Sequence, residues 1–187
     1  ERVFIRSGSR WPHSRIKKKG QLPSYLPFPF FLAYTASLLK QSKNEIFVID
    51  AVAVDWDKQR FLEEFFYLKH HIILLEVTTP TIDYDLQLIK EIKQKINTTI
   101  VICGSHATVY ANELLQDKNL DFVIKGEYEM TFKNLVDTLN KNEDLTKLKG
   151  VVFRKNGEIF DTPDAPLIEP LDILPPPARE LFPINSA

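Results

Sequence analysis

The residues with the most chemical potential lie in the stretch from Cys103 to Thr108, where an apolar run ends and a helical pattern begins. Within it, His106 could ligate a metal, act as a general base, or pack its imidazole against a ligand. A lone histidine without a second ligand in the sequence does not make a metal site. A cysteine at the end of a buried strand usually behaves as a small apolar residue. We therefore predict no metal site and no catalytic residue here, and a packing role for His106.

Two other stretches of the same kind flank this one. Residues 78–81 (Thr-Thr-Pro-Thr) follow an apolar run, and residues 126–129 (Gly-Glu-Tyr-Glu) follow another. In an open parallel sheet, the loops that leave the carboxyl ends of the strands form one edge, and ligands bind there. The sequence therefore predicts that the segments 78–81, 104–108 and 126–129, called the rim segments below, form a binding edge.

Composition and missing motifs exclude several function classes. The formal net charge of −1 argues against a general nucleic-acid or acidic-membrane binder. The chain has neither a glycine-rich phosphate loop nor a serine elbow flanked by glycines, so nucleotide hydrolysis and serine-hydrolase chemistry are not expected. The apolar stretch 28–39 falls short of the roughly 18 residues of a membrane span. The single cysteine fits a reducing, cytoplasmic compartment.

Apolar runs alternate with helical patterns along most of the chain. The runs interpreted as strands are 3–5, 45–50, 72–77, 99–102 and 122–124. Helices are expected at 30–40, 57–70, 82–96, 109–116 and 132–139. This alternation predicts an α/β fold with a doubly wound, Rossmann-like or flavodoxin-like sheet of five parallel strands. Right-handed crossovers would then place all strand carboxyl ends on one edge.

The carboxyl-terminal part of the chain follows a different pattern. Asn156-Gly157 between two apolar segments is a strong signal for a β-hairpin. The prolines that follow are typical of an extended linker. We expect three parts: a Rossmann-like domain at 1–145, a hairpin appendage at 146–162 and a proline-rich linker at 163–187.

The motifs and their order resemble a known family. Thr79-Pro-Thr-Ile82, Gly104-Ser-His-Ala-Thr108 and Asp121-Phe-Val-Ile-Lys-Gly-Glu-Tyr-Glu129 look like the cobalamin-binding domain of cobalamin-dependent radical S-adenosylmethionine enzymes. Arg10-Trp-Pro12 resembles the start of that domain, and residues 171–182 resemble its linker into the catalytic barrel. The family's fourth-strand segment usually reads Gly-Gly-Pro-His-Ala-Thr. Here Cys103 replaces the first glycine and Ser105 replaces the proline.

The resemblance implies that the rim segments bind cobalamin. A corrin ring is wide and flat, so it needs a shelf of small side chains, and its peripheral amides need hydroxyl and backbone partners. Gly104 is expected where the backbone passes closest to the ring, since glycine tolerates conformations that a β-carbon forbids. The expected cofactor-binding residues are Arg10, Trp11, Thr78, Thr79, Pro80, Thr81, Gly104, Ser105, His106, Ala107, Thr108, Gly126, Glu127 and Glu129.

The resemblance also suggests how the cobalt is held. Many cobalamin enzymes ligate cobalt through the histidine of an Asp-x-His-x-x-Gly loop, and this chain has no such triplet. We therefore expect cobalt without a histidine lower ligand, with residues 78–81 or water below it. The parent enzyme would be a radical S-adenosylmethionine methyltransferase, although other members of the family catalyse rearrangements or cyclisations.

The catalytic half of such an enzyme would lie outside this chain. An iron–sulfur cluster of the radical family needs three cysteine thiolates, and Cys103 is the only cysteine here. S-adenosylmethionine and a [4Fe–4S] cluster are therefore expected in a radical S-adenosylmethionine barrel of the same parent chain. Two alternatives remain: a doubly wound interaction or regulatory domain that binds no cofactor, and a degenerate member that has lost cobalamin.

Overall fold

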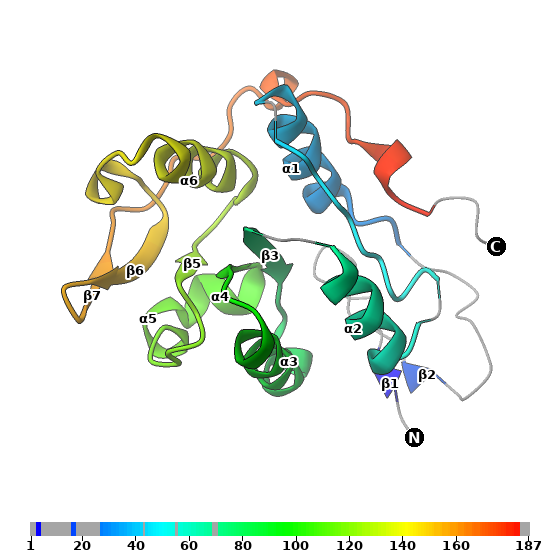
Figure 1. The fold of residues 1–187 in the computed structure, drawn as a ribbon. Coiled ribbons are helices and arrows are strands. Elements are labelled where there is room, and N and C mark those ends of the chain that lie inside the picture. The colour runs from blue at the N-terminus through cyan, green and yellow to red at the C-terminus, as the bar shows by residue number, and fades with distance from the viewer. Residues whose placement is uncertain are drawn as a thin grey trace.

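The main element of the fold is a five-stranded sheet (Figure 1). The computed structural model describes residues 27–42, 44–54, 56–68 and 71–183, together with the backbone of 3–4 and 16–17. The five strands are β3 (Ile72–Glu76), β4 (Thr99–Cys103), β5 (Phe122–Ile124), β6 (Val151–Lys155) and β7 (Glu158–Asp161). They lie side by side in sequence order.

The sheet is mixed, which corrects the prediction of five parallel strands. β3, β4 and β5 are parallel, whereas β5–β6 and β6–β7 are antiparallel pairs. The hairpin forms where Asn156-Gly157 predicts it, and its first strand pairs with β5 through Ile124 and Val151. The hairpin therefore covers an edge of β5 that would otherwise expose unpaired backbone groups.

The two amino-terminal strands of the prediction do not join this sheet. β1 (Val3–Phe4) pairs with β2 (Ile16–Lys17) in a separate antiparallel ladder. The described residues 45–50 form neither a helix nor a strand of a ladder. Ile46 packs against one core cluster and Ile49 against the other. The apolar side chains of this run are therefore explained by their packing on the two core clusters, although the run forms no strand.

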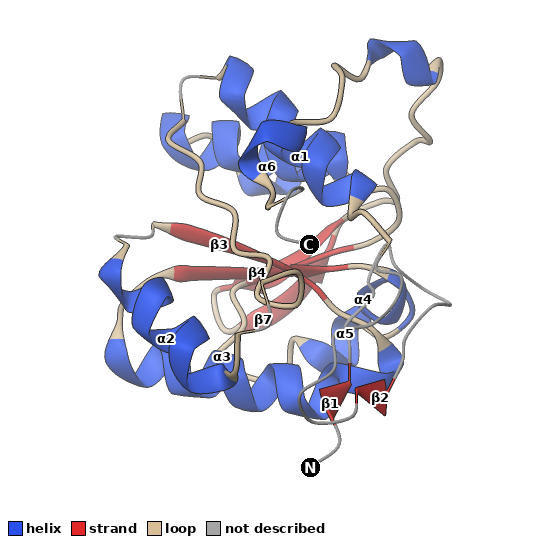
Figure 2. Ribbon diagram, turned by 90° about the vertical axis from the view of Figure 1, so that its right-hand side faces the viewer, coloured by secondary structure: helices blue, strands red, loops and turns tan. Residues whose placement is uncertain are grey.

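Helices cover both faces of the sheet, as predicted (Figure 2). One face carries α1 (Phe30–Gln41) and α6 (Glu129–Lys141). The other carries α2 (Lys58–Tyr67), α3 (Ile82–Lys95), α4 (Ser105–Val109) and α5 (Ala111–Leu114). Side chains alternate along each strand. In β4, Ile100 and Ile102 therefore enter the α2–α5 core, while Val101 and Cys103 enter the α1–α6 core.

Three helices differ in their bounds from the sequence prediction. The helix expected at 132–139 is longer and spans Glu129–Lys141 as α6. The helix expected at 109–116 begins earlier, at Ser105, and is divided at Tyr110 into α4 and α5. α2 ends at Tyr67 rather than at residue 70. Its start agrees with the prediction, because the Asp57 carboxylate accepts a hydrogen bond from the Arg60 N–H at 2.8 Å. None of the described helices is long and apolar enough to cross a membrane.

Beyond β7, residues 163–183, called the tail segment, return to α1. The Ala178 N–H donates to the Ala33 carbonyl at 3.0 Å, and the Ser37 hydroxyl donates to the Pro176 carbonyl at 2.7 Å. The Phe182 ring meets the Phe28 ring edge to face, with centroids 5.1 Å apart. These contacts fix the end of the tail segment on the outer layer of helices.

Candidate functional site

The three rim segments lie together at the carboxyl edge of the parallel strands. The first and second are joined by a hydrogen bond between Thr79 Oγ1 and His106 Nδ1, 3.0 Å apart. The second and third are joined by the Gly126 N–H, which donates to Thr108 Oγ1 at 3.0 Å. Short βα connections thus bring together residues that are separated by almost fifty positions in the sequence.

A buried chain of hydroxyls anchors the first rim segment. Thr81 donates to a carboxylate oxygen of Asp85 at 3.0 Å, and its hydroxyl lies 3.1 Å from that of Thr78. All three side chains are buried. Because the Thr81 proton goes to Asp85, Thr81 accepts from Thr78. Thr79 and Pro80 are exposed and face the rim.

Packing within the protein requires a glycine at position 104. Its φ is 102° and its ψ −175°, a region in which side chains are rarely found. A β-carbon at this position would lie 2.7 Å from the Val77 carbonyl oxygen. The side of Gly104 on which a β-carbon would lie is therefore closed by the backbone of Val77, just after β3. Ala107, another expected site residue, is fully buried in the α2–α5 core.

His106 is held in a fixed, uncharged setting. Its ring packs on the Tyr110 ring with centroids 4.7 Å apart and an interplanar angle of 35°. Burial lowers the pKa of His106 below its usual value, and nearby Asp83 offsets this only in part. The imidazole is therefore neutral at pH 7. Among the described residues, no three histidine, cysteine or acidic side chains are grouped to hold a metal ion.

The third rim segment divides into an exposed and a buried half. Gly126 has a φ of 71°, and a β-carbon there would meet nothing within 4 Å. The Glu127 carboxylate accepts a hydrogen bond from the Ile168 N–H at 2.6 Å, so it holds the tail segment. Glu129 is buried at the start of α6, and burial raises its pKa, although backbone N–H groups oppose the shift.

Two residues near the rim were missed by sequence reasoning. Lys125 contacts Asp161 Oδ1 at 2.6 Å and Asp164 Oδ1 at 2.8 Å, which fixes the tail segment beside β5. Tyr128 is buried, and this burial raises the pKa of its phenol well above the usual value, with Cys103 and Glu76 adding to the effect. Tyr128 lies within the Gly-Glu-Tyr-Glu motif, which could have drawn attention to it. No local sequence signal indicated the partners of Lys125.

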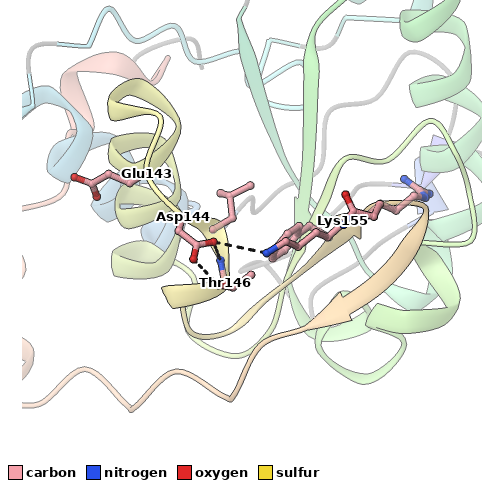
Figure 3. A pocket seen from close by; sticks show the side chains of 8 residues that line it. Glu143, Asp144, Thr146 and Lys155 are labelled. Atoms are coloured by element: carbon pink, nitrogen blue, oxygen red, sulfur yellow. Dashed lines mark hydrogen bonds and ion pairs between the residues drawn. The ribbon is translucent and has the colours of Figure 1, made fainter.

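The structure contains a hollow at each edge of the sheet. One, of about 270 Å³, opens beside His106 and Tyr110, between the start of α3 and α4–α5. The other, of about 380 Å³, lies between the end of α6 and the β6–β7 hairpin. Figure 3 shows it, with the Asp144 carboxylate between Thr146 and Lys155. Because β6 runs antiparallel to β5, this second hollow lies at the edge opposite the rim.

Of the expected site residues, the structure brings Thr79, His106, Thr108 and Gly126 together at the surface through the hydrogen bonds described above. It places Thr78 and Thr81 beneath that surface. Arg10 and Trp11 lie outside the described residues.

Comparison with known proteins identifies the class of domain. The family model of the B12 binding domain matches residues 25–136, which is more than half of the chain and includes all three rim segments. This match agrees with the resemblance inferred from the sequence.

Curated relatives have the same origin but are longer. An uncharacterized methyltransferase of Pyrococcus horikoshii is 31% identical over 164 residues, covering 84% of this chain and 35% of the relative. An anaerobic magnesium-protoporphyrin IX monomethyl ester cyclase of Synechocystis is 35% identical over 78 residues, covering 41% of this chain and 16% of the relative. The chain thus spans about a third or less of these proteins.

Solved structures share the fold at low sequence identity. The cobalamin-dependent S-adenosylmethionine radical enzyme OxsB, with aqua-cobalamin and S-adenosylmethionine bound, superposes with a TM-score of 0.71 at 15% identity, over 82% of this chain and 22% of that one. The radical S-adenosylmethionine methyltransferase TsrM of Kitasatospora setae, with cobalamin and a [4Fe–4S] cluster bound, gives a TM-score of 0.64 at 18% identity, over 79% and 28%.

Proposed function

The chain belongs to the B12-binding domain family, and from this premise we propose that its rim segments bind cobalamin. In this proposal the chain is the cofactor-binding module of a larger radical S-adenosylmethionine enzyme. Cobalamin, when bound, supplies a cobalt centre that can carry a methyl group. The protein's own contribution is to bind the ring, orient it and present one face.

The observation that carries the proposal is the exposed surface of small residues where the rim segments meet, called the shelf below and formed by Ser105, Thr108 and Gly126. These residues lie on neighbouring segments. The space where a Gly126 β-carbon would lie is empty. Hydrogen bonds between segments hold this surface in one shape, and preorganisation of this kind reduces the entropic cost of binding. A wide, flat ring with hydrogen-bonding side chains fits such a shelf.

The residues also fit a cobalt without a protein imidazole below it. The Nδ1 atom of His106 is engaged by the Thr79 hydroxyl, so this nitrogen is already held by a protein contact. Stacking on Tyr110 further restricts the ring. We assign His106 a packing role beside the macrocycle, with residues 78–81 or water nearest the cobalt.

The reaction of the parent enzyme is proposed from the relatives. A curated relative that matches 84% of this chain is called a methyltransferase, so methyl transfer is the reaction we propose. S-adenosylmethionine and the [4Fe–4S] cluster would belong to the remaining part of such a protein, since Cys103 is the only cysteine here and is buried. A buried, reduced thiol suits the cytoplasm, where we place the protein.

Retention of hydroxocobalamin through gel filtration, under reducing and anaerobic conditions, tests the proposal. The unmodified chain should elute as a coloured protein. Ser105→Trp places a bulky ring on the shelf and should elute colourless. Gln94→Trp, at an exposed position near the far end of α3, is the matched control and should stay coloured. A colourless unmodified chain would favour an interaction domain or a degenerate family member.

A further inference from the structure

The hollow beside His106 has a composition that restricts what can enter it. Its lining combines apolar side chains of α3 and α5 with an imidazole, a phenol and carboxylates. The lining residues are Ile82, Asp83, Leu86, His106, Tyr110, Glu113, Leu114 and Asp117. It adjoins the shelf directly, because His106 belongs to the second rim segment.

The charge of this hollow is negative and has no counter-charge in its lining. Three carboxylates contribute to the wall, and neither a lysine nor an arginine does. His106 adds no positive charge, since its pKa is lowered by burial. An anionic group entering the hollow would meet like charges, which is unfavourable even near a surface. A neutral N–H donor would instead find several acceptor oxygens.

The size of the hollow excludes the whole ring. Pockets that enclose a drug-sized ligand have volumes of roughly 300–1,000 Å³. At about 270 Å³ and open to solvent, this hollow accommodates a side chain of a larger ligand rather than the ligand itself. The apolar lining residues suit the short methylene stem of such a side chain, and the polar lining residues suit the polar group at the end of that stem.

We propose that this hollow is a subsite for one of the b, d and e propionamides of the corrin ring. The inference rests on the proposed function, since it assumes that cobalamin lies on the shelf. The amide N–H₂ donates to the carboxylates of Asp83 and Glu113, while the methylene stem contacts Ile82, Leu86 and Leu114. The subsite thereby selects the amide over the corresponding acid and fixes the rotation of the ring on the shelf.

The experiment uses cobalamin and its three monocarboxylic acid derivatives, in which the b, d or e propionamide is hydrolysed. Dissociation constants are measured by absorbance titration of the unmodified chain with each compound. One derivative should bind roughly tenfold more weakly than the other two, because only its carboxylate enters the negative hollow. Raising the salt concentration should reduce the difference, since exposed charges are screened.

Two variants assign the effect to the hollow. In Asp83→Asn/Glu113→Gln, the penalty for that derivative should fall to about threefold or less, because two of the three negative charges are gone. Asp117 is left unchanged, since its carboxylate accepts hydrogen bonds from the Asn119 N–H and amide. The control, Glu143→Gln, removes one charge from the hollow at the opposite edge and should leave the penalty intact.

The possible results separate the two proposals. Equal binding of cobalamin and all three acids, or a penalty that survives in the double variant, would overturn the subsite while leaving cobalamin binding intact. Failure of cobalamin and all three acids to bind the unmodified chain would overturn the proposed function, and the subsite with it.

Discussion

Replacing Gly104 by alanine should destabilise the protein far more than the same change at Gly126. Both glycines have a positive φ, 102° and 71°, and both lie in rim segments. They differ in surroundings, because a β-carbon at Gly104 would lie 2.7 Å from the Val77 carbonyl oxygen, whereas one at Gly126 would meet open space. Comparing the two alanine variants therefore separates the cost of backbone strain from the cost of a steric clash.

The expected magnitudes follow from these two terms. A side chain in the backbone region of Gly104 costs roughly 1–3 kcal/mol. Forcing an atom into a packed site adds roughly 1–3 kcal/mol. Gly104→Ala should therefore lose about 4 kcal/mol in free energy of unfolding. Gly126→Ala carries only the cost of a left-handed backbone, about 1–2 kcal/mol.

Urea unfolding followed by far-ultraviolet circular dichroism measures the difference. With a denaturant slope of about 2 kcal/mol per molar urea, the midpoint should fall by about 2 M for Gly104→Ala and by less than about 1 M for Gly126→Ala. Equal shifts would refute the reasoning, since the Val77 carbonyl would then yield at no cost. A large loss at Gly104 also means that substitutions there report folding as well as ring binding, which is why Ser105 is the better test of the shelf.

The remaining predictions concern the cobalt and the tail segment. In the cobalamin-loaded protein, His106→Ala should weaken binding modestly, and the electron paramagnetic resonance of the reduced cofactor should lack nitrogen superhyperfine splitting before and after the change. Splitting that disappears in the variant would make His106 the ligand. Lys125→Met removes two ion pairs that hold the tail segment, at a cost of about 1 kcal/mol. The rate of proteolysis within residues 163–175 should therefore rise by about fivefold. The control, Lys133→Met, breaks an ion pair within α6 and should leave that rate unchanged. Although burial opposes it, hydrogen bonds from Lys125 and Asn112 lower the pKa of Asp161, so this link contributes stability above about pH 4 and is lost as the pH falls further. Unchanged cleavage at pH 3 would contradict that assignment.

The local sequence pattern predicted an element correctly where its hydrophobic periodicity fits only one kind of secondary structure. In α3, Ile82, Leu86, Ile89 and Ile92 repeat at three and four residues, and the helix begins at Ile82 as predicted. The apolar run 45–50 fits either a paired strand or an unpaired segment that packs on both core clusters, and sequence alone does not choose between them. A hairpin signal, likewise, does not say which strand the hairpin will pair with.

For the candidate site, the sequence predicted which segments meet, but it did not predict which contacts their residues make. Short connections fixed the positions of Thr79, His106 and Thr108 at one edge. The engagement of Glu127 with Ile168, forty-one positions away, depends on the path of the tail segment. Gly104 was identified as a required glycine, but the sequence did not indicate that the Val77 carbonyl, just after β3, would require it. Long-range partners of this kind leave no periodic signal.

The contact between α1 and the tail segment has a consequence for the order of folding during synthesis. The Ser37–Pro176 hydrogen bond joins residues 139 positions apart, and the Lys40–Glu180 ion pair joins residues 140 apart. Chains emerge from the ribosome amino end first, at roughly 5–20 residues per second. α1 must therefore wait roughly 7–28 seconds for these partners, and the Phe28 ring lacks its Phe182 neighbour during that time. Among the described helices, α1 is thus made before the others but gains its last contacts only when the tail segment is complete, which gives chaperones that shield apolar surface a long period of access to it.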